Sequence, residues 1–199
     1  TVNAHYIQLG DAPLARLHVL IDTTPGQIPK YDPAAIEERL VEASRSWTDH
    51  LLDALTADHG EEQGLRLCDA FADAFPSDYR QHYGAAAAVT DIGKLQSVLD
   101  SGVVAMDLHR PAGQADDQVR LKLYQPGQPI PLSDVLPMLE HMGLKVVDEL
   151  PHSVRPGDDD TVIWIHDFGL ETRNGDGVDL KAVRENFEDT FLRVWQGAV

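Results

Sequence analysis

The stretch Val119-Arg-Leu-Lys-Leu-Tyr124 decides the fold class, because apolar and polar side chains alternate along it. A period of two is typical of a β-strand with one buried face. The spacing of apolar residues around it predicts further elements: strands at 103–110, 144–150 and 161–168, and helices at 132–142 and 178–195. The order from residue 103 is therefore β-β-α-β-β-α. This half of the chain is predicted to be an α+β domain.

The first half of the chain is predicted to be mainly helical, after a strand at 16–21. Asp32-Pro33 is typical of a helix start, and the apolar stripe after it predicts one long helix ending at His59-Gly60. A second helix is expected at 61–74 and a third after Thr90, a possible N-cap. We expect three parts: a strand and turn from the end of a preceding module (1–30), a helical segment (31–88) and the α+β domain (89–199).

Composition and charge exclude several classes of protein. Sixteen basic residues stand against thirty-three acidic ones, for a net charge of -17. Such a chain repels phosphate, so neither nucleic acid nor a membrane surface is expected as a partner.

Cys68 is the single cysteine, which indicates a reducing, cytoplasmic setting. Its place beside an apolar helix face predicts a buried, inert thiol. The absence of an initiator methionine suggests a piece excised from a longer chain.

The motifs that carry chemistry are incomplete. Asp167-Phe168-Gly169 matches the magnesium-binding tripeptide of protein kinases, but the sequence has no glycine-rich phosphate loop to accompany it. No G-x-G-x-x-G fingerprint occurs. His166 with Asp167, and the acidic run 158–160, lack the spacing of metal ligands, and the run is expected to be a solvated loop. Asp107 and His109 share one strand face, which is expected to be its wetter face. We therefore predict no catalytic and no metal site.

Several separated stretches carry a resemblance to a known family. In chain order they are Arg45-Ser-Trp-Thr-Asp49, Ala74-Phe-Pro-Ser-Asp-Tyr79, Leu121-Lys-Leu-Tyr124, Pro129-Ile-Pro-Leu-Ser-Asp-Val-Leu-Pro-Met-Leu139, Gly143-Leu-Lys-Val-Val-Asp-Glu149, Val162-Ile-Trp-Ile-His-Asp-Phe-Gly-Leu170 and Asn186-Phe-Glu-Asp-Thr-Phe191. Together they resemble the regulatory N-terminal region of the large bacterial NAD-specific glutamate dehydrogenases. The resemblance implies a parent enzyme that oxidises L-glutamate to 2-oxoglutarate and ammonium. It also implies that NAD and the catalytic residues belong to a C-terminal domain outside this chain.

The resemblance further implies an ACT-type module, a ferredoxin-like antiparallel sheet with helices on one face. The last strand of such a module has no counterpart after 178–195, and strand 103–110 is expected to fill that sheet edge by a permuted route. ACT modules usually bind an amino acid where the first strand turns into the first helix. That position corresponds here to Gln128, Ile130, Pro131, Leu132 and Ser133. Pro131 has no N–H, so a ligand carboxylate would be held by Ser133, which is also expected to cap the helix, and by nearby main-chain amides.

Two hypotheses about function remain open from the sequence. One is an allosteric amino-acid sensor, which binds a free amino acid. The other is a structural ACT-like module for oligomerisation or domain docking, without a ligand. The expected partners are the rest of the parent chain and further copies in a homo-oligomer. A third hypothesis is an independent small enzyme. The sequence does not combine a nucleophile, a base and an oxyanion stabiliser to support it.

Overall fold

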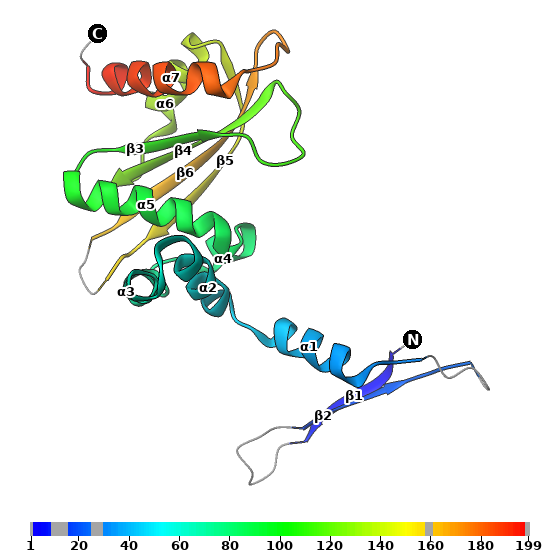
Figure 1. Cartoon of the computed structure of the whole chain (residues 1–199). Helices are drawn as coiled ribbons and strands as arrows, with labels where there is room; N and C mark the ends of the chain where they lie inside the picture. The colour runs from blue at the N-terminus through cyan, green and yellow to red at the C-terminus, as the bar shows by residue number, and fades with distance from the viewer. Residues whose placement is uncertain (1, 9–15, 25–29, 158–160, 198–199) are drawn as a thin grey trace. The chain divides into compact units, whose positions relative to one another are not determined.

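The computed structural model describes residues 2–8, 16–24, 30–157 and 161–197 (Figure 1). The chain divides into two compact units, Thr1–Arg45 and Ser46–Val199. The three-part division at residues 30 and 88 stays a prediction. The acidic run 158–160 lies outside the described residues. No helix among those that are described is long and apolar enough to cross a bilayer.

The first unit contains a hairpin and a helix. Strand β1 (Val2–Gln8) pairs antiparallel with β2 (Arg16–Ile21), and α1 (Pro33–Ser44) follows. Of these strands the sequence predicted only β2. The Asp32 side chain accepts a hydrogen bond from the main-chain N–H of Ala34, so α1 begins where it was predicted. No residue of α1 is buried within the chain.

The long helix predicted up to His59 is wrong, because the chain is broken after α1. Arg45 has extended dihedral angles, and α2 (Trp47–His59) begins anew at the N-cap Ser46. Ser46 and Asp49 form a capping box: the serine side chain accepts from the Asp49 N–H, and the aspartate accepts from the Ser46 N–H. These reciprocal bonds satisfy main-chain donors that a continuous helix would otherwise pair. The apolar stripe continues across the break, so spacing alone could not reveal it.

Three more helices form a layer with α2 in the second unit: α3 (Glu61–Phe71), α4 (Ser77–His82) and α5 (Ala85–Ser101). Helices α2 and α3 pack closely, since a Cβ atom at Gly64 would lie only 2.7 Å from the Thr56 main chain. The start of α5 was predicted too late, at Thr90. It begins at Ala85 because the alanine run is already helical, as its high propensity favours. Cys68 is buried in this layer, as predicted.

The sheet has four antiparallel strands in the order β3-β4-β6-β5. They are β3 (Ala105–His109), β4 (Gln118–Pro126), β5 (Leu144–Val154) and β6 (Ile163–Thr172), with α6 (Leu132–His141) and α7 (Leu180–Trp195) as connecting and terminal helices. The predicted strands and helices of this half are confirmed. Strand β3 pairs with β4 at the sheet edge, which confirms the predicted permuted closure.

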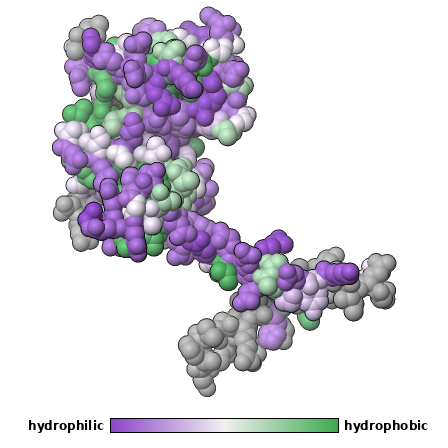
Figure 2. All heavy atoms as spheres, in the orientation of Figure 1, coloured by the Kyte–Doolittle hydropathy of each residue, from purple (hydrophilic) through white to green (hydrophobic). Residues whose placement is uncertain are grey.

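Both faces of the sheet are packed, each by a different set of helices (Figure 1). On the α6–α7 face, Leu121, Leu123 and Phe168 pack with residues of α6 and α7 such as Leu139 and Phe191. This arrangement confirms the predicted α+β class with a ferredoxin-like, ACT-type sheet. On the opposite α5 face, strand residues such as Tyr124 and Ile165 share a core with α2–α5. The side of the molecule seen in Figure 2 is mostly hydrophilic, in keeping with the net charge of -17.

Candidate functional site

The predicted ligand residues lie together where β4 turns into α6. Gln128, Pro131, Leu132 and Ser133 are exposed, whereas Ile130 is 5 % exposed and belongs to the core. Ser133 does not cap α6, contrary to the prediction. The N-cap is Pro131, whose extended dihedral angles start the helix one residue earlier, and the Ser133 hydroxyl donates to the Asp134 carboxylate instead. No side chain caps α6, so its start offers main-chain donors only.

His166 holds this loop against the sheet from the middle of β6. Its Nε2 accepts a hydrogen bond from the Ile130 main-chain N–H at 3.0 Å, and its Nδ1 lies 2.7 Å from a carboxylate oxygen of Glu149. Because Nε2 is the acceptor, the ring proton of the neutral imidazole lies on Nδ1 and is donated to Glu149. His166 is 3 % exposed. The Ile130 N–H, one of the main-chain donors of this loop, is therefore already used inside the protein.

The rings beside His166 fix its orientation. Trp164 and Phe168, two residues away on either side of the same strand, stack on it with ring centroids 6.1 and 6.2 Å away. We call the contact of Glu149, His166 and Ile130 the loop latch. Sequence reasoning considered His166 only as a metal ligand and so missed this role. The available signal was a histidine at alternate spacing with apolar residues on a buried strand, which requires partners for both ring nitrogens.

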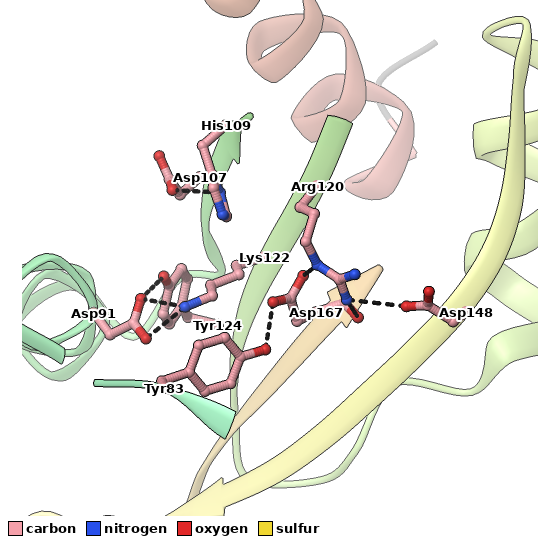
Figure 3. A network of polar contacts seen from close by, with 9 residues as sticks. All are labelled: Tyr83, Asp91, Asp107, His109, Arg120, Lys122, Tyr124, Asp148 and Asp167. Atoms are coloured by element: carbon pink, nitrogen blue, oxygen red, sulfur yellow. Dashed lines mark hydrogen bonds and ion pairs between the residues drawn. The ribbon is translucent and has the colours of Figure 1, made fainter. Parts of the chain in front are cut away.

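A buried polar network lies on the other face of the sheet, between β4 and helices α4 and α5 (Figure 3). Asp91 of α5 and Lys122 of β4 form an ion pair with Nζ–O distances of 3.0 and 2.7 Å. Tyr79 and Tyr124 donate their hydroxyl groups to the same carboxylate. Asp91 and Lys122 are 1 % and 3 % exposed, so both charges depend on each other for solvation.

The network continues along the sheet through Asp167. Its carboxylate accepts from the Tyr83 hydroxyl of the helical layer and, at 2.7 Å, from Nε of Arg120. A second nitrogen of Arg120, Nη2, lies 3.0 Å from Asp148. Burial, followed by the hydrogen bond to Asp167, raises the pKa of Tyr83, so its hydroxyl remains a donor at neutral pH. These groups are mutually satisfied, and they tie the helical layer to the sheet.

Asp107 and His109 are brought together as their shared face predicted, with 2.9 Å between Nδ1 and the carboxylate. The His109 ring lowers the pKa of Asp107, which is thereby held in its charged form. Among the described residues no group of three or more histidine, cysteine or acidic side chains could hold a metal ion.

A sheet of this strand order, with α6 and α7 on one face and a β-α-β-β-α sequence of elements, defines a ferredoxin-like, ACT-type module. Comparison with known families agrees in three successive segments. The chain matches the glutamate dehydrogenase ACT2 domain at residues 1–48, helical motif 2 at 54–98 and the ACT3 domain at 103–183.

Curated relatives give the family. The NAD-specific glutamate dehydrogenase of Halomonas elongata is 38 % identical over 95 % of this chain, and that of Pseudomonas aeruginosa is 33 % identical over 92 %. The Mycobacterium tuberculosis protein of the same name is 28 % identical over 88 %. The chain therefore belongs to the NAD-specific glutamate dehydrogenase family, to its ACT-containing N-terminal region. It spans only 11–12 % of the length of these relatives.

Proposed function

We propose that this chain is a non-catalytic regulatory and assembly region of a longer NAD-specific glutamate dehydrogenase. The whole protein would oxidise L-glutamate to 2-oxoglutarate and ammonium, with NAD bound in a domain outside this chain. The names of the relatives support this assignment, and so does the missing dinucleotide fingerprint. With one cysteine in 199 residues, we place the protein in the cytoplasm.

The loop latch is the observation that favours an assembly role over an amino-acid sensor at the β4–α6 loop. Ile130 already donates its N–H to His166, and Pro131 has no N–H to offer. A carboxylate that took the Ile130 N–H would have to displace this buried imidazole and leave its Nε2 without a donor. The loop therefore keeps only the exposed main-chain donors at the start of α6 for such a ligand. We infer that the module holds the enzyme together through its surfaces. The partners would be the rest of the parent chain and further copies of it.

Hydrogen exchange tests the loop latch directly. We expect the Ile130 amide to be protected in the wild-type chain and to exchange faster in His166→Phe, which keeps a ring but removes the acceptor. Trp164→Phe is the matched control, because Trp164 lies on the same face of β6 and stacks on His166 without bonding the loop. Unchanged Ile130 protection in His166→Phe would contradict the loop latch.

A ligand screen and a measurement of mass separate the two functions. A thermal-shift screen of the twenty amino acids and NAD should find no stabilisation that depends on Ser133, since a ligand of the folded state raises the melting temperature. A Ser133-dependent shift, confirmed by calorimetry, would establish the sensor instead. Light scattering should find an oligomer without ligand. Val147→Lys, a charge on the exposed edge strand β5, should dissociate it, whereas Val183→Lys on α7 should not.

A further inference from the structure

The loop latch fits only one protonation state of His166. Nε2 of the ring accepts a hydrogen bond from the Ile130 main-chain N–H, and Nδ1 donates its proton to Glu149. An imidazolium ring carries a hydrogen on both nitrogens and accepts no hydrogen bond. Protonation therefore sets two N–H groups against each other across the 3.0 Å between Nε2 and the Ile130 nitrogen. The contact between the sheet and the loop is incompatible with that state.

The loop has no neighbouring donor that could replace the Ile130 N–H. Pro129 and Pro131 flank Ile130, and proline has no N–H. The segment is anchored on both sides, because the Gly127 N–H donates to the Val162 carbonyl at 2.8 Å and α6 begins after Pro131. Loss of the latch therefore frees residues 128–131 and leaves the strands and α6 in place.

Glu149 allows the buried ring to hold a proton. Its carboxylate lies 2.7 Å from Nδ1 of His166, and its side chain is 16 % exposed. A carboxylate in this position favours the imidazolium, because two opposite charges attract strongly where little water screens them. The proton therefore stays on the sheet, next to Glu149, while the loop loses its hydrogen bond.

Among the residues that the structure describes, no other charged side chain forms an ion pair or a hydrogen bond with the ring. Leu123 of β4 and Pro151 of β5 lie opposite His166 in the sheet. Asp167 points to the other face, into the polar network. Residues 125–131 include no ionisable side chain. The ionisable residues of α6 and α7, which cover this face, are exposed or half-exposed: Asp134, Glu140, His141, Lys181, Arg184, Glu185, Glu188, Asp189 and Arg193.

We propose that the loop latch is a proton-operated switch, in which neutral His166 holds the β4–α6 loop closed and protonated His166 releases it. The proton comes from solvent and binds Nε2, so no covalent bond of the main chain changes. Release takes the Ile130 side chain, 5 % exposed in the closed loop, out of the core that it shares with α6. Acidification therefore changes the surface where β4 turns into α6. The switch rests on the loop latch but not on the proposed assembly role.

NMR spectroscopy of the 199-residue chain with isotope-labelled histidine tests the switch. The ring nitrogen shifts distinguish the neutral Nδ1–H form of His166 from the imidazolium. The protection factor of the Ile130 amide, its exchange rate relative to an unstructured peptide at the same pH, reports on the loop. Between about pH 8 and about pH 5 the ring should take up a proton. With the same midpoint the Ile130 protection factor should fall about tenfold or more, as expected for the loss of one hydrogen bond, while amides in the middle of β6 stay protected.

A matched pair of variants tests the role of the carboxylate. Glu149→Gln keeps an acceptor for Nδ1 but removes the charge, so the midpoint of opening should move to lower pH by about one pH unit or more. Glu171→Gln makes the same change on β6, where the carboxylate contacts Lys145 and Gln118 instead of the ring. It should leave the midpoint unchanged. Equal midpoints in the two variants would contradict the part assigned to Glu149.

Three results would overturn the switch and leave the loop latch standing. One is a protonated His166 ring beneath an Ile130 amide that stays protected. Another is a ring that stays neutral until the whole chain unfolds. The third is loss of protection throughout β6 with the same midpoint, which is global acid unfolding. An Ile130 amide that is unprotected already at about pH 8, where the ring is neutral, would instead overturn the loop latch and with it the observation that favours the assembly role.

Discussion

Replacing Asp91 by asparagine should strongly destabilise the second unit. The change keeps the size of the side chain but removes the only negative charge that Lys122 contacts within hydrogen-bond distance among the described residues. Because Lys122 is 3 % exposed, its ammonium cannot recover a full hydration shell. Removing one partner of a buried ion pair costs about 3–5 kcal/mol. Since 1 kcal/mol shifts the melting temperature of a unit this size by about 2–4 °C, we expect a fall of roughly 6–20 °C.

Urea denaturation at pH 7, followed by tryptophan fluorescence, measures the free energy of unfolding of Asp91→Asn. Lys122→Met and the double variant complete a cycle. The double variant should lose less than the sum of the two single ones, by about 0.5–3 kcal/mol, because no unpaired charge remains buried. A loss below about 1 kcal/mol in Asp91→Asn, or strict additivity in the double variant, would refute the view that this ion pair ties α5 to the sheet.

Three further outcomes are expected. Ser46→Ala should lower the free energy of unfolding by about 1 kcal/mol through loss of the capping box, with Ser44→Ala as control, and an unchanged urea midpoint would contradict the cap. The lowered pKa of Asp107 contributes stability that is present above its ordinary value of 3.8 and lost as the pH falls through the folded-state value; Asp107→Asn should flatten this acid dependence in urea titrations at stepped pH. Burial and then the charge of Asp69 raise the pKa of Cys68, so native protein should react with a thiol reagent far more slowly than protein in urea, and equal rates would show an accessible thiolate.

Strands β3 and β4 could be predicted because their apolar residues stand at alternate positions, as packing against one core requires. Val119, Leu121 and Leu123 point to the α6–α7 core, and Tyr124 points to the other core. A shift of such a strand by one residue would turn its apolar side chains to the other face. Burial therefore fixes the register, and the alternation in the sequence predicts it. The boundaries of the helices were harder to predict from the sequence. The break at Ser46 depends on two side chains that bond the main chain, and the apolar stripe on either side of them gives no sign of it.

The sequence predicted which residues form the candidate site but not which atoms they contact. The residues of the β4–α6 loop do lie together. The acceptor of the Ile130 N–H is His166 of β6, which lies thirty-six positions further along the chain. The register that sets Leu123 opposite His166 decides this contact. The sequence contains both residues without stating which nitrogen, carboxylate or amide each will meet. Only the pairing of the strands supplies that information.

One extra residue in β5 decides to which face of the sheet Asp148 and Glu149 point. The register of β5 on β6 shifts between Val146 and Asp148, so Val147 is left without a partner in the ladder and 53 % exposed. A regular strand would turn Glu149 toward the α5 face and Asp148 toward α6 and α7. The bulge reverses both, which brings Glu149 to His166 and Asp148 to Arg120. The loop latch on one face and the Arg120–Asp148 ion pair on the other therefore depend on the same irregularity. Strict period-two reasoning places each of these carboxylates on the wrong side.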